Sequence, residues 1–159
     1  MKGNDKVIAA LNQLLADELT AISQYMVHSE MCANWGYEKL HKAIEHQAID
    51  EMHHAEWLIQ RIIFFEGAPI VTKLNSLKIG QSVLAIVTTD QASELDAIQA
   101  YNAAIRLAQE LADEATAELL RKILLMEEGH VDWAEQQSDQ IEQMGLANYL
   151  TNQTAGAAG

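Results

Sequence analysis

The chain has little of several residue types, and each shortage excludes a class of protein. Cys32 is the one cysteine among 159 residues, so neither an internal disulfide nor a four-cysteine metal site can form within the chain. Lysine and arginine number 10 against 23 aspartates and glutamates, which gives a net charge of −13. Nucleic-acid phosphates would repel this charge. We therefore expect neither a disulfide-stapled secreted protein nor a nucleic-acid-binding one.

Long apolar runs are also missing. None approaches the roughly 20 residues of a membrane-spanning helix, and residues 1–6 lack the apolar stretch of a secretory signal. We expect a cytoplasmic protein with no membrane partner. Hydrophobic residues still make up 49% of the chain, so residues 1–159 can form a single domain with a core. The acidic charge favours attraction of cations, although a need for solubility explains it as well.

Proline and glycine are scarce and mark the ends of long segments with helical periodicity. Pro69 is the one proline, and it follows Gly67 where a helical pattern stops. The periodicity predicts four helices at about residues 5–33, 37–66, 82–112 and 113–144. Ser82 and Asp113 are the expected N-caps of the last two. A short fifth helix at about 146–152 and a flexible tail at about 153–159 complete the prediction.

The connections predict how these helices are arranged. Those near residues 36 and 113 are short, so the first and second helices, and the third and fourth, should be antiparallel neighbours. Residues 70–81 have no clear period and are numerous enough to run back along the bundle. The predicted fold is all-α: a four-helix bundle with a long crossover between the second and third helices.

Each half of the chain carries the same pattern of potential metal ligands. A lone glutamate precedes a Glu-x-x-His motif by the same interval in both halves. The residues are Glu18, Glu51 and His54, then Glu94, Glu127 and His130. Glu and His three residues apart project from one face of a helix. Four carboxylates and two imidazoles suit two iron or manganese ions side by side, the pattern known from ferritin-like di-iron proteins.

Burial strengthens this interpretation. Glu18, Glu94 and Glu127 fall on apolar stripes of their helices, and a buried carboxylate must be paired, protonated or bound to metal. The alternative is that some of the six face solvent or pair with lysine or arginine.

Other side chains are placed to support such a site. Tyr25 and Tyr101 each follow a lone glutamate by two helical turns, so both phenols should point along the inner face. They are either core tyrosines or donors of a hydrogen bond, or of an electron, to the metal site. Asp90, one turn before Glu94, is a candidate acceptor for the free ring N–H of a ligand histidine. A place on the helix surface is its alternative.

The residues that carry this chemistry resemble bacterioferritins, the haem-containing branch of the ferritins. The most specific stretches are 23–25, 49–52 with His54 and Ala55, and 127–133, and the likeness runs from residue 1 to residue 150. It implies a ferritin-like bundle in which each Glu-x-x-His half holds one iron. Glu51 and Glu127 would bridge the two ions, and Tyr25 would take part in catalysis.

The resemblance also implies a function. Twenty-four subunits, arranged as dimers, would form a hollow homo-oligomeric shell. Iron(II) would be oxidised with oxygen or peroxide at the ferroxidase centre and stored inside as ferric mineral. A ferredoxin-type reductant is the expected partner for release.

Met52 follows Glu51, so it points about 100° away from the metal face, toward a partner subunit. The resemblance implies that two copies of Met52 ligate one haem b shared between two subunits. The residues expected to line this haem are Leu19, Ile22, Met26 and Ile49. Without the resemblance, Met52 is a packing methionine. Glu45 and Leu58 stand where relatives often carry aromatic residues, which affects the haem surroundings and not the six ligands.

The remaining histidines have simpler interpretations. His46 and Asp50 lie one helical turn apart and could bind a secondary metal in transit, or form a solvated surface pair. His28 and His41 are expected at the surface or in an interface.

Two other functions compete with iron storage. The first is a di-metal oxidase or peroxidase that stores nothing, although the short fifth helix favours shell assembly over a lone bundle. The second is a haem-carrying structural subunit of a mixed shell, although the complete set of six ligands argues against it. A DNA-protecting relative is unlike this chain, because such proteins build their site between subunits.

Overall fold

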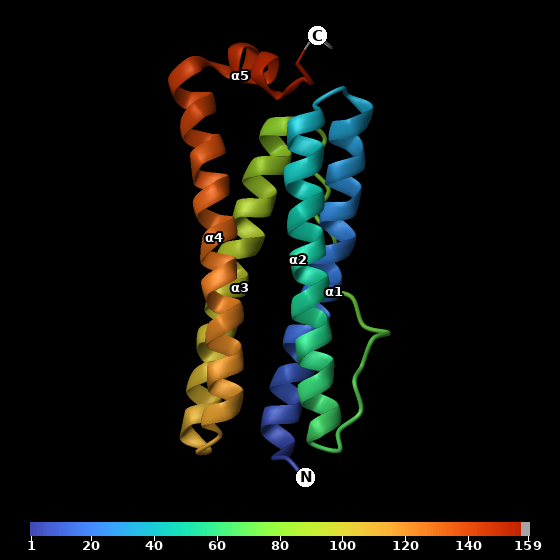
Figure 1. The fold of residues 1–159 in the computed structure, drawn as a ribbon, viewed down its shortest axis with the longest axis vertical. Coiled ribbons are helices and arrows are strands. Elements are labelled where there is room, and N and C mark those ends of the chain that lie inside the picture. The colour runs from blue at the N-terminus through green and yellow to red at the C-terminus, as the bar shows by residue number, and fades with distance from the viewer. Residues whose placement is uncertain (157–159) are drawn as a thin grey trace.

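The computed structural model describes residues 1–156, and within them five helices account for all the regular structure. Four long helices lie side by side and the short fifth crosses one end of the bundle (Figure 1). They are α1 (Asp5–Asn34), α2 (Glu38–Phe64), α3 (Val83–Glu110), α4 (Glu114–Met144) and α5 (Leu146–Gln153). The predicted four-helix bundle with a short C-terminal helix is confirmed.

Local signals explain where the helices begin and end. The Ser82 side chain accepts a hydrogen bond from the Ala85 amide and Asp113 accepts one from the Thr116 amide, so both predicted N-caps are confirmed. Gly36, with φ of +83°, turns the chain between α1 and α2. The helix α5 ends at Gln153, one residue later than predicted. Residues 154–156 of the expected tail are irregular, and its last three positions, residues 157–159, lie outside the described residues.

The crossover between α2 and α3 runs along the outside of α1 (Figure 1). It is irregular, so its amides cannot bond within a helix or sheet. Side chains spaced by multiples of four residues on one face of α1 accept them instead. The bonds run from Ile70 to Asn12, Asn75 to Thr20, Lys78 to Gln24 and Gly80 to His28, at 2.8–3.1 Å. This row of acceptors fixes the crossover on α1.

The apolar core is divided into two clusters along the bundle. One contains Leu15, Leu58 and Leu120 and lies toward the N-terminal end of α1. The other contains Ile44 and Tyr149 and lies toward α5. The six potential ligands fall between these clusters on every long helix, so a buried polar layer separates two apolar layers. Within residues 1–156, no helix combines the length and the apolar character needed to cross a membrane.

Candidate metal centre

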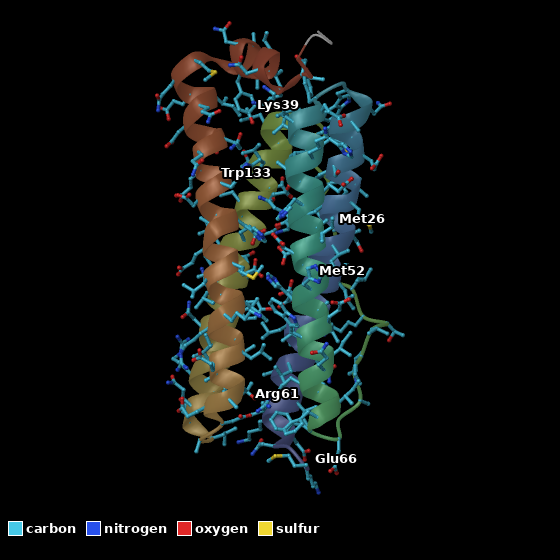
Figure 2. The ribbon with its side chains drawn as sticks, in the orientation of Figure 1. Met26, Lys39, Met52, Arg61, Glu66 and Trp133 are labelled. Atoms are coloured by element: carbon cyan, nitrogen blue, oxygen red, sulfur yellow. The ribbon has the colours of Figure 1, made fainter. Side chains whose placement is uncertain are left out.

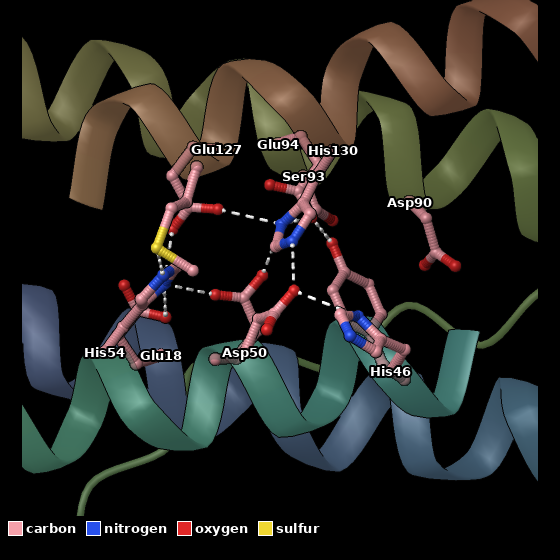
Figure 3. Close-up of polar contacts among 12 residues, drawn as sticks. Glu18, His46, Asp50, His54, Asp90, Ser93, Glu94, Glu127 and His130 are labelled. Carbon is pink, nitrogen blue, oxygen red and sulfur yellow. Dashed lines mark hydrogen bonds and ion pairs between the residues drawn. The ribbon is translucent and has the colours of Figure 1, made fainter. Parts of the chain in front are cut away.

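The six potential ligands come together between the two apolar clusters of the bundle. Figure 3 labels five of them, Glu18, His54, Glu94, Glu127 and His130. They form two overlapping groups whose nitrogen and oxygen atoms lie within 4.8 Å of one another. The first group is Glu18, Glu51, His54 and Glu127, and the second is Glu51, Glu94, Glu127 and His130. All six side chains are buried. The structure therefore brings together every residue that the repeated pattern singled out.

Glu51 and Glu127 belong to both groups because each directs one oxygen toward each histidine. His54 Nδ1 lies 2.7 Å from Glu51 Oε2 and 3.2 Å from Glu127 Oε1. His130 Nδ1 lies 3.1 Å from Glu51 Oε1 and 3.2 Å from Glu127 Oε2. A carboxylate that offers its two oxygens to two neighbouring positions can bridge two cations. Glu18 and Glu94 lie at the two ends of the cluster. Glu18 Oε2 is 3.6 Å from His54 Nδ1, and Glu94 Oε1 is 3.5 Å from His130 Nδ1.

In the metal-free cluster, the pKa values of several carboxyl groups differ from their ordinary values. Burial and the charge of Glu51 raise the pKa values of Glu18 and Glu94 well above the usual range. Burial alone would also raise the pKa of Glu127, but the imidazoles of His130 and His54 lower it to about 2. Divalent cations relieve this repulsion without protons, so the residues present fit a two-metal centre.

Two buried tyrosines hold the end carboxylates in a crossed arrangement. The Tyr25 hydroxyl, on α1, donates to Glu94 on α3, and the Tyr101 hydroxyl, on α3, donates to Glu18 on α1. Each tyrosine thus supports the ligand on the other helix and not the one that precedes it in sequence. The sequence predicted the inner face but not the exchange between helices.

The outer nitrogens of the two histidines meet different partners. His130 Nε2 lies 3.2 Å from Asp50 Oδ2, whereas His54 Nε2 lies 3.4 Å from Met126 Sδ. Asp50 also lies 3.2 Å from His46 Nδ1, so the pair considered as a secondary metal site is in contact with the centre. Sequence reasoning missed both outer contacts, because they join helices that are distant in sequence.

Neither interpretation of Asp90 was right, because it is buried and contacts no ligand histidine, and the surface or interface position expected for His28 was also wrong. Asp90 accepts from His28 Nδ1 at 2.8 Å and from Gln24 Nε2 at 2.9 Å, and not from a ligand histidine. His28 is completely buried, because the crossover covers the face of α1 that carries it. His41, by contrast, is partly exposed.

A cavity reaches the centre from the side of the bundle that the crossover covers. Its wall includes the end ligands Glu18 and Glu94 together with Asn75 and Lys78 of the crossover. The cavity gives the centre a passage to the outer surface.

A groove on the outer face of α1 and α2 collects most of the residues expected around a haem. Ile22, Met26, Ile49 and Met52 line it, and Figure 2 shows Met26 and Met52 on these neighbouring helices. The exposed fractions of Met26 and Met52 are 53% and 43%, which is high for methionine. Leu19 does not line the groove and packs on the core instead.

Comparison with known proteins agrees with this geometry. The ferritin-like domain of the ferritin family matches residues 8–144. A bacterioferritin of Brucella melitensis biotype 1 is 40% identical over 149 residues, covering 94% of this chain and 92% of the relative. A bacterial ferritin of Synechocystis sp. is 39% identical over 154 residues, covering 96% and 99%. A bacterioferritin of Rhodobacter capsulatus is 40% identical over 145 residues, covering 91% and 90%. The chain therefore belongs to the ferritin family, among the bacterioferritins, as its own fold, its buried carboxylate–histidine cluster and these relatives together show.

Proposed function

We propose that this protein is an iron-storage ferritin that oxidises iron(II) at the buried centre. The observation that carries the proposal is the sharing of Glu51 and Glu127 between two ligand groups. A site for one metal needs a single group of ligands. Two groups that share a pair of carboxylates fit two ions, and hard oxygens with imidazole suit iron.

The protein side chains supply position and charge to this chemistry. Glu18 with His54, and Glu94 with His130, would complete the two ends, and Glu51 with Glu127 would lie between the ions. Bound iron(II) supplies the electrons that reduce oxygen or peroxide. Tyr25 and Tyr101 orient the end carboxylates through their hydroxyls. The apolar layers above and below limit access of water from either end of the bundle.

The passage along the crossover suits delivery of a cation. Its lining includes the carboxylates of Asp17 and Asp96 and the amide of Asn75, beside the single cationic side chain of Lys78. The net charge of −13 favours the approach of cations over anions. Iron(II) is thus a fitting substrate for a centre reached in this way.

Storage requires an assembly, and we include a homo-oligomeric shell of 24 subunits in the proposal. The likeness of nearly the whole chain to bacterioferritins supports it, as does α5, which a lone bundle enzyme does not need. A haem between two subunits at the Met52 groove, a ferredoxin-type reductant and a cytoplasmic location are the further parts of the proposal. The single cysteine agrees with a reducing compartment.

Replacing one shared carboxylate tests the function. Glu127→Ala should slow oxygen consumption after addition of iron(II) by about 100-fold or more, because a lost metal ligand removes several kcal/mol of stabilisation. Glu128→Ala is the matched control, since Glu128 is the next residue and is exposed. Wild-type rates in Glu127→Ala would exclude the centre.

Storage is tested separately from oxidation. Light scattering should give a particle more than ten times the subunit mass of 17.6 kDa, in the wild type and in Glu127→Ala alike. After aerobic loading, iron should co-elute with this particle in the wild type. A monomer or dimer that oxidises iron(II) but retains none would favour a di-metal oxidase.

A further inference from the structure

A second set of metal-ligand side chains lies away from the di-metal centre, where the C-terminal half of α1 packs on the start of α2. It consists of Glu30 from α1 and of His41 and Glu45 from α2. One ligand atom from each lies within 4.8 Å of the others. None of the three belongs to the two groups at the middle of the bundle.

The orientation of His41 is set by a buried serine. Ser29 is 2% exposed, and its Oγ lies 2.8 Å from His41 Nδ1. The Ser29 hydroxyl donates to the His41 carbonyl oxygen at 3.1 Å, so its oxygen is left to accept from the ring. The Ser29 carbonyl oxygen is a second acceptor, 3.2 Å from the same Nδ1. The ring proton of neutral His41 therefore sits on Nδ1.

The lone pair of the ring, on Nε2, then faces Glu45. His41 Nε2 lies 3.5 Å from Glu45 Oε2, with Glu30 beside them. Lone pairs on three such atoms repel one another unless a cation lies between them. Within residues 1–156, no lysine or arginine nitrogen comes within 4.0 Å of either carboxylate. The two carboxylates therefore have neither a lysine nor an arginine as a partner within residues 1–156.

We propose that Glu30, His41 and Glu45 bind one divalent transition-metal ion of the zinc class at the outer face of the α1–α2 pair. Zinc takes imidazole nitrogens and carboxylate oxygens as ligands, and three protein ligands with one solvent molecule complete its tetrahedron. A histidine whose other nitrogen donates to a backbone carbonyl oxygen, as His41 Nδ1 can to Ser29, is a usual arrangement at metal sites. The distance from Nε2 to Oε2 is close to the edge of a zinc tetrahedron, about 3.4 Å for bonds near 2.1 Å.

The site would tie two helices together beside the Met52 groove. Glu30 and Glu45 also line this groove, so the ion would place positive charge at a position that is otherwise acidic. Glu45 and His41 are four residues apart on one helix face, while Glu30 comes from the neighbouring helix. The ion would thus cross-link α1 and α2 near the turn at Gly36.

Zinc content provides the test. Haem-free, iron-free protein is equilibrated with a slight excess of Zn²⁺, desalted and measured by elemental analysis. Glu45→Gln and His41→Ala should each hold one zinc per subunit fewer than the wild type. Because any zinc at the di-metal centre is the same in all samples, the difference reports this cluster alone. Glu45→Gln preserves the shape of an exposed side chain, so it avoids a loss of folding.

A matched control is available on the same helix. His53 lies 3.2 Å from Glu56 in an exposed pair, and this pair belongs to none of the three-ligand groups within residues 1–156. His53→Ala should hold as much zinc as the wild type. Equal zinc in wild type and Glu45→Gln would overturn the proposal and leave His41 and Glu45 as a pair of neighbouring side chains on one helix. An equal loss in His53→Ala would also overturn it, because that result indicates adsorption to surface histidines.

Discussion

His54 Nε2 lies 3.4 Å from the Sδ atom of Met126, across the interface between α2 and α4. The equivalent nitrogen of His130 meets Asp50 at 3.2 Å. A thioether is a weak acceptor, whereas a carboxylate fixes the ring and raises the basicity of the ligating nitrogen. The two halves therefore repeat the same ligands but give them different outer partners.

This asymmetry predicts unequal binding of two ions. Asp50→Ala should weaken binding at the His130 end by about 10–100-fold, while Met126→Leu should change binding at the His54 end by less than about threefold. Titration with Co²⁺, followed by visible absorption, measures both. His46→Ala is the control for the other contact of Asp50. Similar losses in Asp50→Ala and Met126→Leu would mean that the outer partners do not distinguish the two ends.

The contact between Asp90 and His28 predicts that one hydrogen bond between the crossover and α1 depends on Asp90. Asp90 holds the proton on His28 Nδ1, which leaves Nε2 to accept from the Gly80 amide at 2.9 Å. Asp90→Ala removes that constraint, and exchange of the Gly80 amide hydrogen should rise about tenfold, the effect of losing one buried hydrogen bond. Hydrogen exchange followed by mass spectrometry measures it.

The row of acceptors on α1 supplies a control for this experiment. Asn12 accepts the Ile70 amide at the other end of the crossover. Asn12→Ala should speed exchange at Ile70 and leave Gly80 unchanged, the reverse of Asp90→Ala. If both variants raised hydrogen exchange equally along the whole crossover, the hydrogen bonds to α1 would form one cooperative unit and would not open independently.

The sequence predicted the helices and the six central residues because both depend on short-range geometry. A Glu-x-x-His motif on a regular helix must present its two side chains together. The lone glutamates Glu18 and Glu94 fall on apolar stripes that can face only the core. Because the spacing of the ligands is the same in both halves, the two sets were also expected to lie at the same height along an antiparallel bundle.

The contacts around the centre were harder to predict because they depend on the axial alignment of separate helices. Periodicity shows which face of α4 carries Met126, but not which residue of α2 lies opposite. His28 was misplaced for a related reason. Its face of α1 would be exposed in a bare four-helix bundle, and an irregular segment without any periodic signal covers it.

The pKa shifts at the centre predict that metal binding releases protons. Burial alone would lower the pKa values of His54 and His130, but the surrounding carboxylates raise both well above the ordinary value of 6.5. We therefore expect both rings to be protonated at pH 7 in the metal-free protein. A metal ligand must be a neutral imidazole or an ionised carboxylate. Zn²⁺ binding should therefore release about two protons per subunit from these rings, in addition to any proton held by Glu18 or Glu94, whose pKa values are also raised.

The sign of the pH dependence follows from this release. Since protons are products of binding, the affinity for metal should increase as the pH rises toward the raised histidine pKa values. Calorimetry in buffers with different ionisation enthalpies counts the protons, and His54→Ala should release about one fewer. Binding that is independent of buffer and pH would contradict protonated rings in the metal-free state.

Met52 tests the proposed haem between subunits. It follows Glu51 on α2 but lies on the exposed groove and outside both ligand groups. If two copies ligate one haem, Met52→Leu should remove or shift the haem absorption bands, because leucine has no thioether. Initial oxidation of iron(II) should persist, since all six central residues are unchanged. Release of stored iron under reducing conditions should slow, because electrons would lose their path at the subunit boundary.

A second methionine in the same groove separates ligation from packing. Met26 lines the groove and is also exposed, so Met26→Leu removes an equivalent thioether without removing the expected ligand. Spectra of haem reconstituted side by side into wild type, Met52→Leu and Met26→Leu give the comparison. The bands should change only in Met52→Leu. A wild-type spectrum in Met52→Leu would remove Met52 as the ligand and leave it as a methionine that packs in the groove.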